Sequence, residues 1–416
     1  MIQTNKTREE FQKEALQKFR EHKNLALEWA TGVGKSKVAI DIIKEVFDNE
    51  RDLWTVFRPF KCLLIVAETA HKDNWEKEFA KWGLVVDITV ECYASLKNYQ
   101  NTEWDLIIFD EAHHAASELR QSFIETIKSK HILLLSATMD PDVIDNLKDI
   151  YGDFYISRVG LKTAIDNGIL PQPQVYVIPL TLDNTIRDCD VVKTRGNSSK
   201  RVVVECSYPE MFKYIKDKTK FPNMELHVKC TQKEAYDIYD KDFKHWKTLY
   251  IMSPKPFAKV KWMASGSVRK RFLGSCKVKY VKKLLDILNK KRYICFCSSV
   301  EQAKQLQEKS AIYAGKKGSH KLIDDFNNKV IDHLFAVGML QEGENLVDID
   351  AGIIVQLDGK ERMYIQKSGR TLRAKEPLQF IFYFEGTRDE EYLIKILDTI
   401  DLRYMKKIED LDKFEI

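Results

Sequence analysis

The sequence has no long apolar run, and nowhere does it approach the ~20 consecutive apolar residues that a membrane-spanning helix requires. Its first residues, MIQTNKTREEFQ, also lack the apolar core of a signal peptide. We therefore expect a protein that acts away from the membrane, in the cytoplasm, or in the cytoplasm of a host cell if a phage encodes it.

Cysteines and histidines at metal-ligand spacing are missing too. The eight cysteines include no CxxC pair and show no regular spacing with histidines, which excludes the usual zinc-binding patterns. Cys295 and Cys297 lie two residues apart in an apolar stretch, so they share one face of an expected strand. Burial as small apolar side chains is expected there rather than a metal or disulfide role. The cysteines are predicted to be reduced and structural.

Neither sign of charge dominates. The 67 Lys and Arg residues nearly balance 62 Asp and Glu residues, for a formal net charge of +5. This charge permits a polyanionic partner but does not require one. Short-period repeats and low-complexity tracts are absent as well. The length of 416 residues and the hydrophobic content of 44% indicate a globular protein of two or three domains.

Residues 1–170 alternate apolar strands with helices, which is typical of a doubly wound parallel sheet of the α/β class. The helix expected at 71–82 carries Trp75, Phe79 and Trp82 on one face. We expect that face to pack on the sheet, and stacking on DNA is the alternative. The strands are expected at 24–29, 61–67, 85–91, 104–109 and 131–136.

The alternation stops at 167–173, where a glycine and two prolines predict a linker. Residues 171–275 are expected to form this linker and a basic, partly helical insert, with 191–220 as its most loop-like part. The alternation resumes over 276–416 and predicts a second doubly wound lobe. Its strands are expected at 292–297, 310–313, 333–337, 352–357 and 379–384.

The segment ATGVGKS, residues 30–36, lies between a short apolar strand and a helical pattern. In this context backbone N–H groups and a helix N-terminus face the phosphates of a nucleotide. Lys35 would reach the β- and γ-phosphates, and the Ser36 hydroxyl would bind Mg²⁺. The residues expected to hold the nucleotide here are Thr31, Gly32, Val33, Gly34, Lys35 and Ser36.

The segment DEAH, residues 110–113, follows the strongly apolar strand 105–109. Asp110 at the strand tip can hold the water shell of Mg²⁺, and Glu111 can orient and activate the attacking water. A phosphate-binding loop followed by an acidic strand tip predicts hydrolysis of a nucleoside triphosphate.

Two later segments refine this prediction. Ser136-Ala137-Thr138 ends a strand 26 residues after Asp110 and could couple the nucleotide to domain closure through its hydroxyls. In QKSGRTLR, residues 366–373, Arg370 and Arg373 share a helix face. Arginines supplied across a cleft stabilise charge on the γ-phosphate. A solvated basic helix is the alternative, and it would not explain Gln366 and the following glycine at fixed offsets.

In this order the motifs make the chain resemble superfamily 2 helicases over nearly its whole length. Gln12 lies where that family has its adenine-reading glutamine. Motifs I, Ia, II, III, IV, V and VI correspond to ATGVGKS, AET with Trp75, DEAH, SAT, ICFCSS, MLQEGENL and QKSGRTLR. Within the superfamily, FNNKVIDHLFAVGMLQEGENL and RKRFLGSCK are most similar to phage UvsW-type and restriction-enzyme-like (ResIII-like) DNA helicases.

The resemblance implies two RecA-like lobes, with ATP and Mg²⁺ in the cleft between them and a DNA strand lying across both. The implied metal ligands are Ser36 and Asp110, and the implied nucleic-acid contacts come from around Thr69, Ser95, Ser298 and the motif V loop. The residues implied to act in catalysis are Asp110, Glu111, Gln366, Arg370 and Arg373.

Residues 253–280 interleave basic and aromatic side chains, as a surface that binds phosphates and stacks on bases would. The densest basic cluster is Arg269, Lys270 and Arg271, and Trp262 is the candidate for stacking. The alternative is a helical insert whose aromatic residues pack on the second lobe while its lysines are only solvated. The sequence leaves both open.

The leading hypothesis is an ATP-dependent DNA helicase or translocase that acts as a monomer on single-stranded, forked or branched DNA. An RNA helicase is the less favoured alternative from the same class. A nucleotide-gated clamp on DNA or on a protein is the alternative from another class. The presence of Lys35, Glu111 and both arginines argues against a clamp, which would not need all of them.

Overall fold

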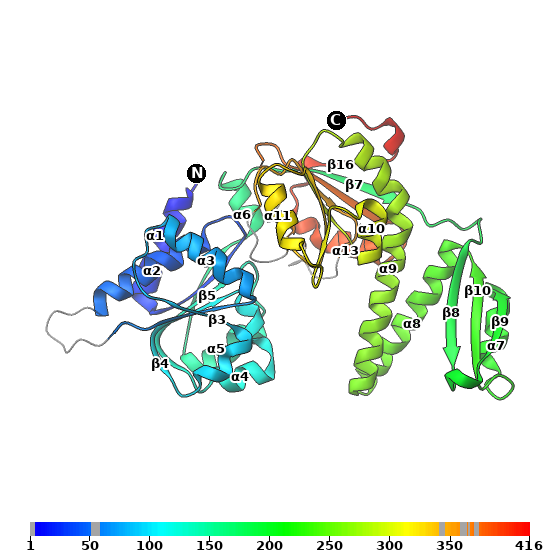
Figure 1. The fold of residues 1–416 in the computed structure, drawn as a ribbon, viewed down its shortest axis with the longest axis horizontal. Helices are drawn as coiled ribbons and strands as arrows, with labels where there is room; N and C mark the ends of the chain where they lie inside the picture. Colours follow the sequence, from blue (N-terminus) through cyan, green and yellow to red (C-terminus); the bar gives the residue numbers. More distant parts are fainter. Residues whose placement is uncertain (1–4, 51–58, 341–345, 358–363, 365–366, 370–373) are drawn as a thin grey trace.

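The computed structural model describes residues 5–50, 59–340, 346–357, 364, 367–369 and 374–416. It consists of two α/β lobes and an insert, which follow one another across the view in Figure 1. Lobe 1 contains the N-terminus, lobe 2 lies in the middle, and the insert extends from lobe 2 on the side away from lobe 1. No helix within the described ranges is both long enough and apolar enough to cross a membrane.

Lobe 1 is built on a six-stranded parallel sheet with the order β3-β2-β4-β5-β1-β6. The five strands that the sequence predicts are confirmed within four residues at each end. The sixth, β6, was not predicted because polar Ser157 and Arg158 interrupt its apolar pattern. The strands are β1 (Asn24–Trp29), β2 (Cys62–Val66), β3 (Thr89–Cys92), β4 (Glu103–Asp110), β5 (Lys128–Ser136) and β6 (Tyr155–Val159).

Helices cover both faces of this sheet. The first helix, α1, starts with a capping box in which the Thr7 hydroxyl accepts from Glu10 N and the Glu10 carboxylate accepts from Thr7 N. Trp75 on α3 is buried against the main core and Phe79 and Trp82 pack beside it, so the predicted packing face is confirmed. The helices are α1 (Arg8–His22), α2 (Lys35–Glu50), α3 (Thr69–Lys81), η1 (Tyr93–Tyr99), η2 (Ala112–Ala116), α4 (Glu118–Ile124), α5 (Pro141–Tyr151) and α6 (Leu161–Asp166).

Lobe 2 has a seven-stranded parallel sheet with the order β12-β13-β11-β14-β15-β7-β16. The five strands predicted for this lobe are confirmed, although β14 ends at Ile354. The strands are β7 (Gln174–Leu180), β11 (Tyr293–Phe296), β12 (Ala311–Tyr313), β13 (His333–Val337), β14 (Ala351–Ile354), β15 (Leu378–Phe384) and β16 (Met405–Lys407). Its helices are α10 (Val300–Gln307), α11 (Ser319–Asn327), α13 (Arg388–Ile396), η4 (Leu397–Thr399), η5 (Leu402–Tyr404) and η6 (Leu411–Lys413).

The predicted boundary at residue 171 needs a correction. Strand β7 precedes the insert in the chain, yet it pairs with β15 and β16 in the lobe 2 sheet. A strand whose partners lie some two hundred residues away carries no local sign of that pairing. The insert therefore starts after β7 rather than before it.

The insert contains a small domain where the sequence predicted loops at 191–220. Its three strands form a sheet with the order β8-β10-β9, and a separate apolar core lies between this sheet and the adjoining helices. One face of β8 is exposed and carries polar residues, while β9 leaves Val202 and Val203 exposed, so neither strand is buried on both faces. The elements are β8 (Cys189–Arg195), η3 (Ser198–Lys200), β9 (Val202–Ser207), α7 (Tyr208–Lys216) and β10 (Met224–Cys230).

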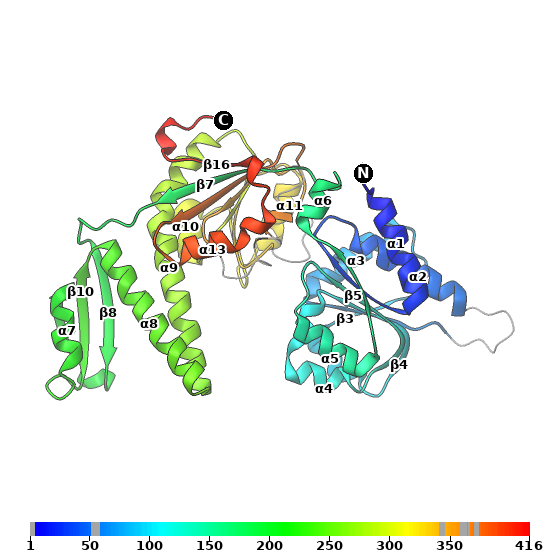
Figure 2. The ribbon, with the colours of Figure 1, turned by 180° about the vertical axis from the view of Figure 1, so that it is seen from behind.

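Two long helices, α8 (Gln232–Met252) and α9 (Pro256–Ile287), complete the insert as an antiparallel hairpin. Both views show the pair running from lobe 2 to a tip that no other drawn element covers (Figures 1 and 2). The far end of α9 buries Val281 and Leu284 in the core of lobe 2. The predicted boundary at 275 therefore falls inside one continuous helix and is corrected.

Candidate nucleotide and nucleic-acid sites

The loop between β1 and α2 has the backbone geometry of a phosphate cradle. Gly32 has φ +92° and Gly34 has φ +110°, a region that side-chain-bearing residues rarely adopt. A Cβ at Gly34 would lie 2.3 Å from Gln12 Nε2, so a side chain here would displace the Gln12 amide. Helix α2 begins directly after this loop at Lys35, and its first N–H groups face the loop.

Helix α1 brings Gln12 against this loop, as the contact with Gly34 shows. The neighbouring Arg8 fixes the helix to the linker by donating from Nη2 to Ile169 O at 3.0 Å. Lys35 Nζ donates to Trp29 O at 2.8 Å, so its ammonium lies at the base of the loop, at the end of β1. The structure thus brings together Gln12 and the predicted loop residues.

Asp110 ends strand β4 and is held from several sides. Its Oδ2 accepts from Trp75 Nε1 at 2.8 Å, and its Oδ1 accepts from Glu111 N at 3.0 Å. Tyr93 donates its hydroxyl to Asp110 O at 3.0 Å. Sequence reasoning gave Trp75 only a packing role, because its apolar helix position does not reveal the indole N–H contact. Trp75 therefore orients the carboxylate as well as filling the core.

Glu111 stands in the left-handed region with φ +48°, which is unusual for a residue with a side chain. Such conformations cost about 1–3 kcal/mol and persist where the surrounding structure imposes them. His113 Nδ1 lies 3.4 Å from Glu111 Oε2 and 3.3 Å from Ser136 Oγ. Because β5 lies between β4 and β1 in the sheet, this imidazole links the ends of β4 and β5 beside the phosphate loop.

Lobe 2 reaches this site through the segment that contains Gly369. A Cβ at Gly369 would lie 2.9 Å from Thr31 Cβ, so only a glycine lets the two backbones approach this closely. Tyr364 and Ser368 anchor the segment on β15, with hydroxyls 3.0 Å and 3.5 Å from Gln379 Oε1. The predicted catalytic residues Gln366, Arg370 and Arg373 lie outside the described residues.

Two family models match separate parts of the chain. The model described as "Type III restriction enzyme, res subunit" matches residues 2–95 and 84–141, and "Helicase conserved C-terminal domain" matches residues 276–375. These matches indicate a superfamily 2 helicase. Enzymes of this kind use ATP and act on nucleic acids. A comparison with curated proteins finds no significant match.

Solved structures agree with this fold. Dbp5 of S. cerevisiae bound to RNA and ADP BeF3 is similar with a TM-score of 0.57 and 12% identity, over 96% of this chain and 89% of Dbp5. The ATP-dependent Type ISP restriction-modification enzyme LlaBIII bound to DNA is similar with a TM-score of 0.54 and 15% identity, over 97% of this chain and 31% of that enzyme. Both lobes are RecA-like helicase domains. Identities this low support the fold and do not decide the nucleic acid.

The predicted nucleic-acid residues of the helicase lie at the carboxyl ends of strands. Thr69 starts α3 after β2, and Ser95 lies in η1 after β3. Because β2 and β3 are parallel neighbours, these two residues share one edge of the lobe 1 sheet. Ser298 follows β11 in lobe 2, and its hydroxyl donates to Gln302 Oε1 at 3.0 Å.

The basic cluster at 269–271 is not the surface that the sequence predicted. Arg269 is only 3% exposed, forms an ion pair with Asp240 on α8, and lies 4.0 Å from the centre of the Phe243 ring. Its guanidinium is therefore engaged inside the hairpin, and its proposed phosphate contact is corrected. Lys270 is half-buried and Arg271 is exposed.

Trp262 needs the same correction. Its ring stacks on Tyr250 of α8 with the ring centroids 5.5 Å apart, and it also contacts Phe243. The indole Nε1 is buried. The ring serves helix packing and is not presented for stacking on a base. The alternative raised for 253–280 expected packing on lobe 2, whereas Trp262 packs on α8 within the hairpin.

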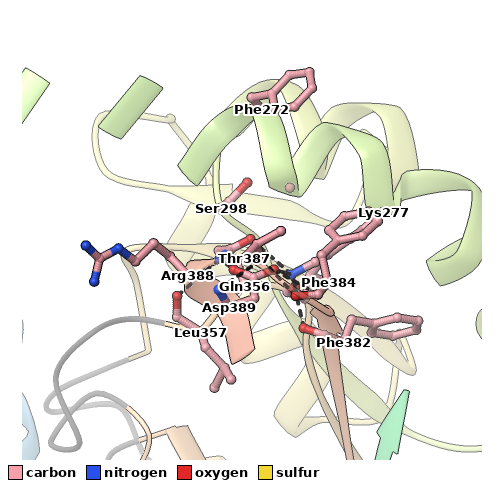
Figure 3. A network of polar contacts seen from close by, with 12 residues as sticks. Phe272, Lys277, Ser298, Gln356, Leu357, Phe382, Phe384, Thr387, Arg388 and Asp389 are labelled. Carbon is pink, nitrogen blue, oxygen red and sulfur yellow. Dashed lines mark hydrogen bonds and ion pairs between the residues drawn. The ribbon is translucent and has the colours of Figure 1, made fainter. Parts of the chain in front are cut away.

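A buried ion pair that sequence reasoning missed joins α9 to lobe 2 (Figure 3). Lys277 is fully buried, and its Nζ lies 2.6 Å from Asp389 Oδ2 at the start of α13. The same ammonium donates to Val355 O at 2.8 Å and to Phe382 O at 3.0 Å, after β14 and near the end of β15. Burial lowers the pKa of Lys277, and the Asp389 charge opposes that shift.

The same face of α9 also contacts the end of β11. Gln302 Nε2 donates to Gly274 O, and a Cβ at Gly274 would lie 2.0 Å from Ser298 Oγ. Gly274 and Lys277 are three residues apart, so one turn of α9 contacts the ends of β11, β14 and β15. This helix therefore connects the insert to the end of β11, where motif IV lies, and to the ends of two further lobe 2 strands.

We expect Lys277→Met to destabilise lobe 2 by about 3–5 kcal/mol, because Asp389 would remain buried without its cation. This loss corresponds to a fall of roughly 6–20 °C in the lobe 2 melting temperature, measured by calorimetry. The double variant Lys277→Met/Asp389→Asn should recover much of the loss, since no charge is then left unpaired. Lys279→Met, which changes an exposed lysine of the same helix, is the control. A single variant that melts like the wild type would refute this account.

Proposed function

We propose that this superfamily 2 helicase is an ATP-dependent DNA helicase or translocase, with ATP hydrolysed between its two lobes. The close approach of Gly369 to Thr31 carries this proposal, because it brings the lobe 2 backbone, at the residue before Arg370 in the sequence, to the phosphate loop. In this proposal Gln12 reads the adenine, Lys35 binds the β- and γ-phosphates, and Glu111 activates the attacking water. Arg370 and Arg373 complete the site from lobe 2.

The residues present fit a Mg²⁺ ion. Ser36 is the second residue of α2, which follows β1, and Asp110 ends β4, which is separated from β1 only by β5 in the same parallel sheet. Hydroxyl and carboxylate oxygens are the ligands that Mg²⁺ prefers. We propose that these two residues hold the ion, which when bound neutralises charge on the phosphate oxygens. The contacts from Trp75 Nε1 and Glu111 N keep the Asp110 carboxylate in a fixed orientation for this task.

Movement follows from the two-lobe arrangement. Closure of the lobes on ATP and reopening after hydrolysis would advance a strand that lies across both. The proposed contacts to the sugar-phosphate backbone of the strand come from Thr69 and Ser95 on lobe 1 and from Ser298 on lobe 2. A translocase needs such contacts because it must tolerate any base sequence. The contact between α9 and Ser298 would let the insert sense the strand held by lobe 2.

DNA rather than RNA is our proposal for the substrate. The match to the restriction-enzyme family model supports it, as does the resemblance of the segments FNNKVIDHLFAVGMLQEGENL and RKRFLGSCK to phage UvsW-type helicases. Dbp5 was solved bound to RNA and LlaBIII bound to DNA, so the structural neighbours do not choose between them and RNA is the alternative. The third hypothesis is a clamp that holds nucleic acid without processive movement. Such a clamp does not need to couple ATP hydrolysis to movement along a strand.

We expect single-stranded or forked DNA to stimulate ATP hydrolysis more than RNA of the same length and sequence does. The measurement is steady-state ATPase across single-stranded DNA, blunt duplex, forked duplex and RNA at fixed salt, because the salt concentration alone changes affinity strongly. Stronger stimulation by RNA would replace DNA with RNA as the substrate. Stimulation without strand separation or displacement of a bound protein would favour the clamp.

A further inference from the structure

The positive charge of the helicase is concentrated in the α8–α9 hairpin. Residues 243–285 contain 12 Lys and Arg residues and no Asp or Glu. The rest of the chain has 55 basic against 62 acidic residues, a net charge of −7. A polyanion is therefore attracted to this hairpin and not to the protein as a whole.

Exposed apolar side chains gather at the tip of the same hairpin. Met252 at the end of α8 is 78% exposed, and Phe257 at the start of α9 is 63% exposed. Ile251, Val260 and Met263 around them are 63–65% exposed. We call these five residues the apolar tip. Both views leave the tip uncovered by any drawn element (Figures 1 and 2).

Lysines surround the apolar tip. Lys255, Lys259 and Lys261 are all exposed, and Lys261 Nζ lies 5.6 Å from the centre of the Phe257 ring. Phosphates need such cations, while the flat ring of Phe257 suits the face of a base. Bases offer their faces where they are unpaired or at the open end of a duplex. The combination fits nucleic acid whose bases are exposed better than it fits a closed duplex, where only phosphates and groove edges are accessible.

The root of the hairpin is fixed rigidly to lobe 2. Asp240 of α8 joins Arg269 of α9 and lies 3.9 Å from Arg388 at the start of α13. Burial raises the pKa of Asp240, but Lys244 and Arg269 outweigh this effect, so its pKa is lowered and its charge is kept. With the Lys277–Asp389 pair further along α9, two buried ion pairs hold the hairpin. The tip must therefore move with lobe 2 when the lobes close.

We propose that the apolar tip and its lysines bind nucleic acid at a junction between duplex and single strand, where the tip packs on the end base pair. This proposal rests on the proposed function and specifies the form of its substrate. Apolar side chains that enter between bases are an established way to separate a stack. The tip would hold the junction while lobe 2 moves, so the duplex opens at a defined place.

The first test replaces the apolar tip without touching its charge. In Met252→Ser/Phe257→Ser we expect roughly tenfold weaker binding to a forked duplex, measured by fluorescence anisotropy, while binding to a relaxed closed-circular duplex, which has no open end, changes less than twofold. Leu119→Ser/Val330→Ser is the control, because these residues are 68% and 69% exposed and lie outside the insert. All four side chains are exposed, so circular dichroism should show folded proteins. Unchanged binding to the fork in the tip variant would overturn the proposal.

The second test removes the lysines of the tip. In Lys259→Gln/Lys261→Gln the slope of log affinity against log salt should fall by about 1.8 on forked DNA, as two lost phosphate contacts require. An unchanged slope contradicts the proposal. The competing occupant is an anionic membrane, which is tested by sedimentation with vesicles of phosphatidylserine and phosphatidylcholine. Loss of vesicle binding in the tip variant together with intact binding to forks would overturn the nucleic-acid proposal in favour of that surface.

These outcomes are separable from failure of the proposed function. If the wild-type protein showed no ATPase stimulation by any DNA or RNA, the proposed function itself would fail. If the wild type were stimulated by DNA and bound forks, but the tip variants bound them equally well, only the inference about the tip would fail.

Discussion

Replacing Lys35 by alanine is expected to lower kcat for ATP hydrolysis by at least about 10³-fold. The ammonium lies at the base of the phosphate loop, 2.8 Å from Trp29 O, where it can turn to the β- and γ-phosphates. Charge that is fixed at the transferring phosphoryl group stabilises the transition state far more than the same charge would in water. The measurement is steady-state ATPase with saturating nucleic acid.

Lys37→Ala is the matched control for Lys35. It lies two residues further along α2, and its ammonium pairs with Asp41 one turn later rather than facing the loop. Its removal should leave kcat within about twofold, since an ion pair between i and i+4 on a helix contributes only about 0.3–0.5 kcal/mol to stability. Turnover like that of the wild type in purified Lys35→Ala would show that the assigned loop is not the active site.

Replacing Arg370 or Arg373 by alanine is expected to cut kcat by on the order of 10³-fold or more, the scale of arginine fingers, with a modest change in ATP affinity. Gly369, the residue before Arg370 in the sequence, packs on Thr31 of the phosphate loop. Lysine at either position should not restore turnover, because an ammonium lacks the planar fork of a guanidinium. Single-turnover hydrolysis together with equilibrium binding of a labelled nucleotide separates the two effects.

If Arg370 and Arg373 act as arginine fingers, their replacement lowers kcat. If they only bind ATP, their replacement lowers the affinity for ATP. If the alanine variants fail to bind ATP at concentrations that saturate the wild type, the arginines act in ground-state binding and the finger assignment is wrong. Gly369→Ala offers an independent check, because its Cβ would collide with Thr31 Cβ at 2.9 Å and push the segment off the loop. We expect this variant to lose turnover although both arginines are present.

The sequence by itself determined those features of the protein that depend only on residues adjacent in the chain. The phosphate loop needs glycines at two positions with positive φ, and the residues at 32 and 34 supply both. Ten of the strands were predictable because buried parallel strands are short, continuous apolar runs. The position of Asp110 at the end of β4 and of the hydroxyls after β5 could also be predicted from these apolar runs. The carboxyl ends of parallel strands lie at a common edge of the sheet, so these groups were expected close together.

Only the tertiary structure decided which charges are buried and which are presented to a partner. Arg269 and Lys259 look alike in the sequence, yet Arg269 is buried because Asp240 and Phe243 of α8 receive it, while Lys259 faces solvent. Lys277 is buried because Asp389, more than a hundred residues away, supplies the opposite charge.

Strand β7 and the indole contact of Trp75 were decided in the same way. The first joins lobe 2 through pairing with β15, and the second meets Asp110 only once α3 packs on the sheet. The free energy of burying a charge or of pairing a strand depends on partners that are far away in the sequence. The residues next to the charge or strand in the chain contain no information about those partners. The sequence therefore predicted the chemistry of the nucleotide site, while the fold alone decided which part of the basic insert can contact nucleic acid.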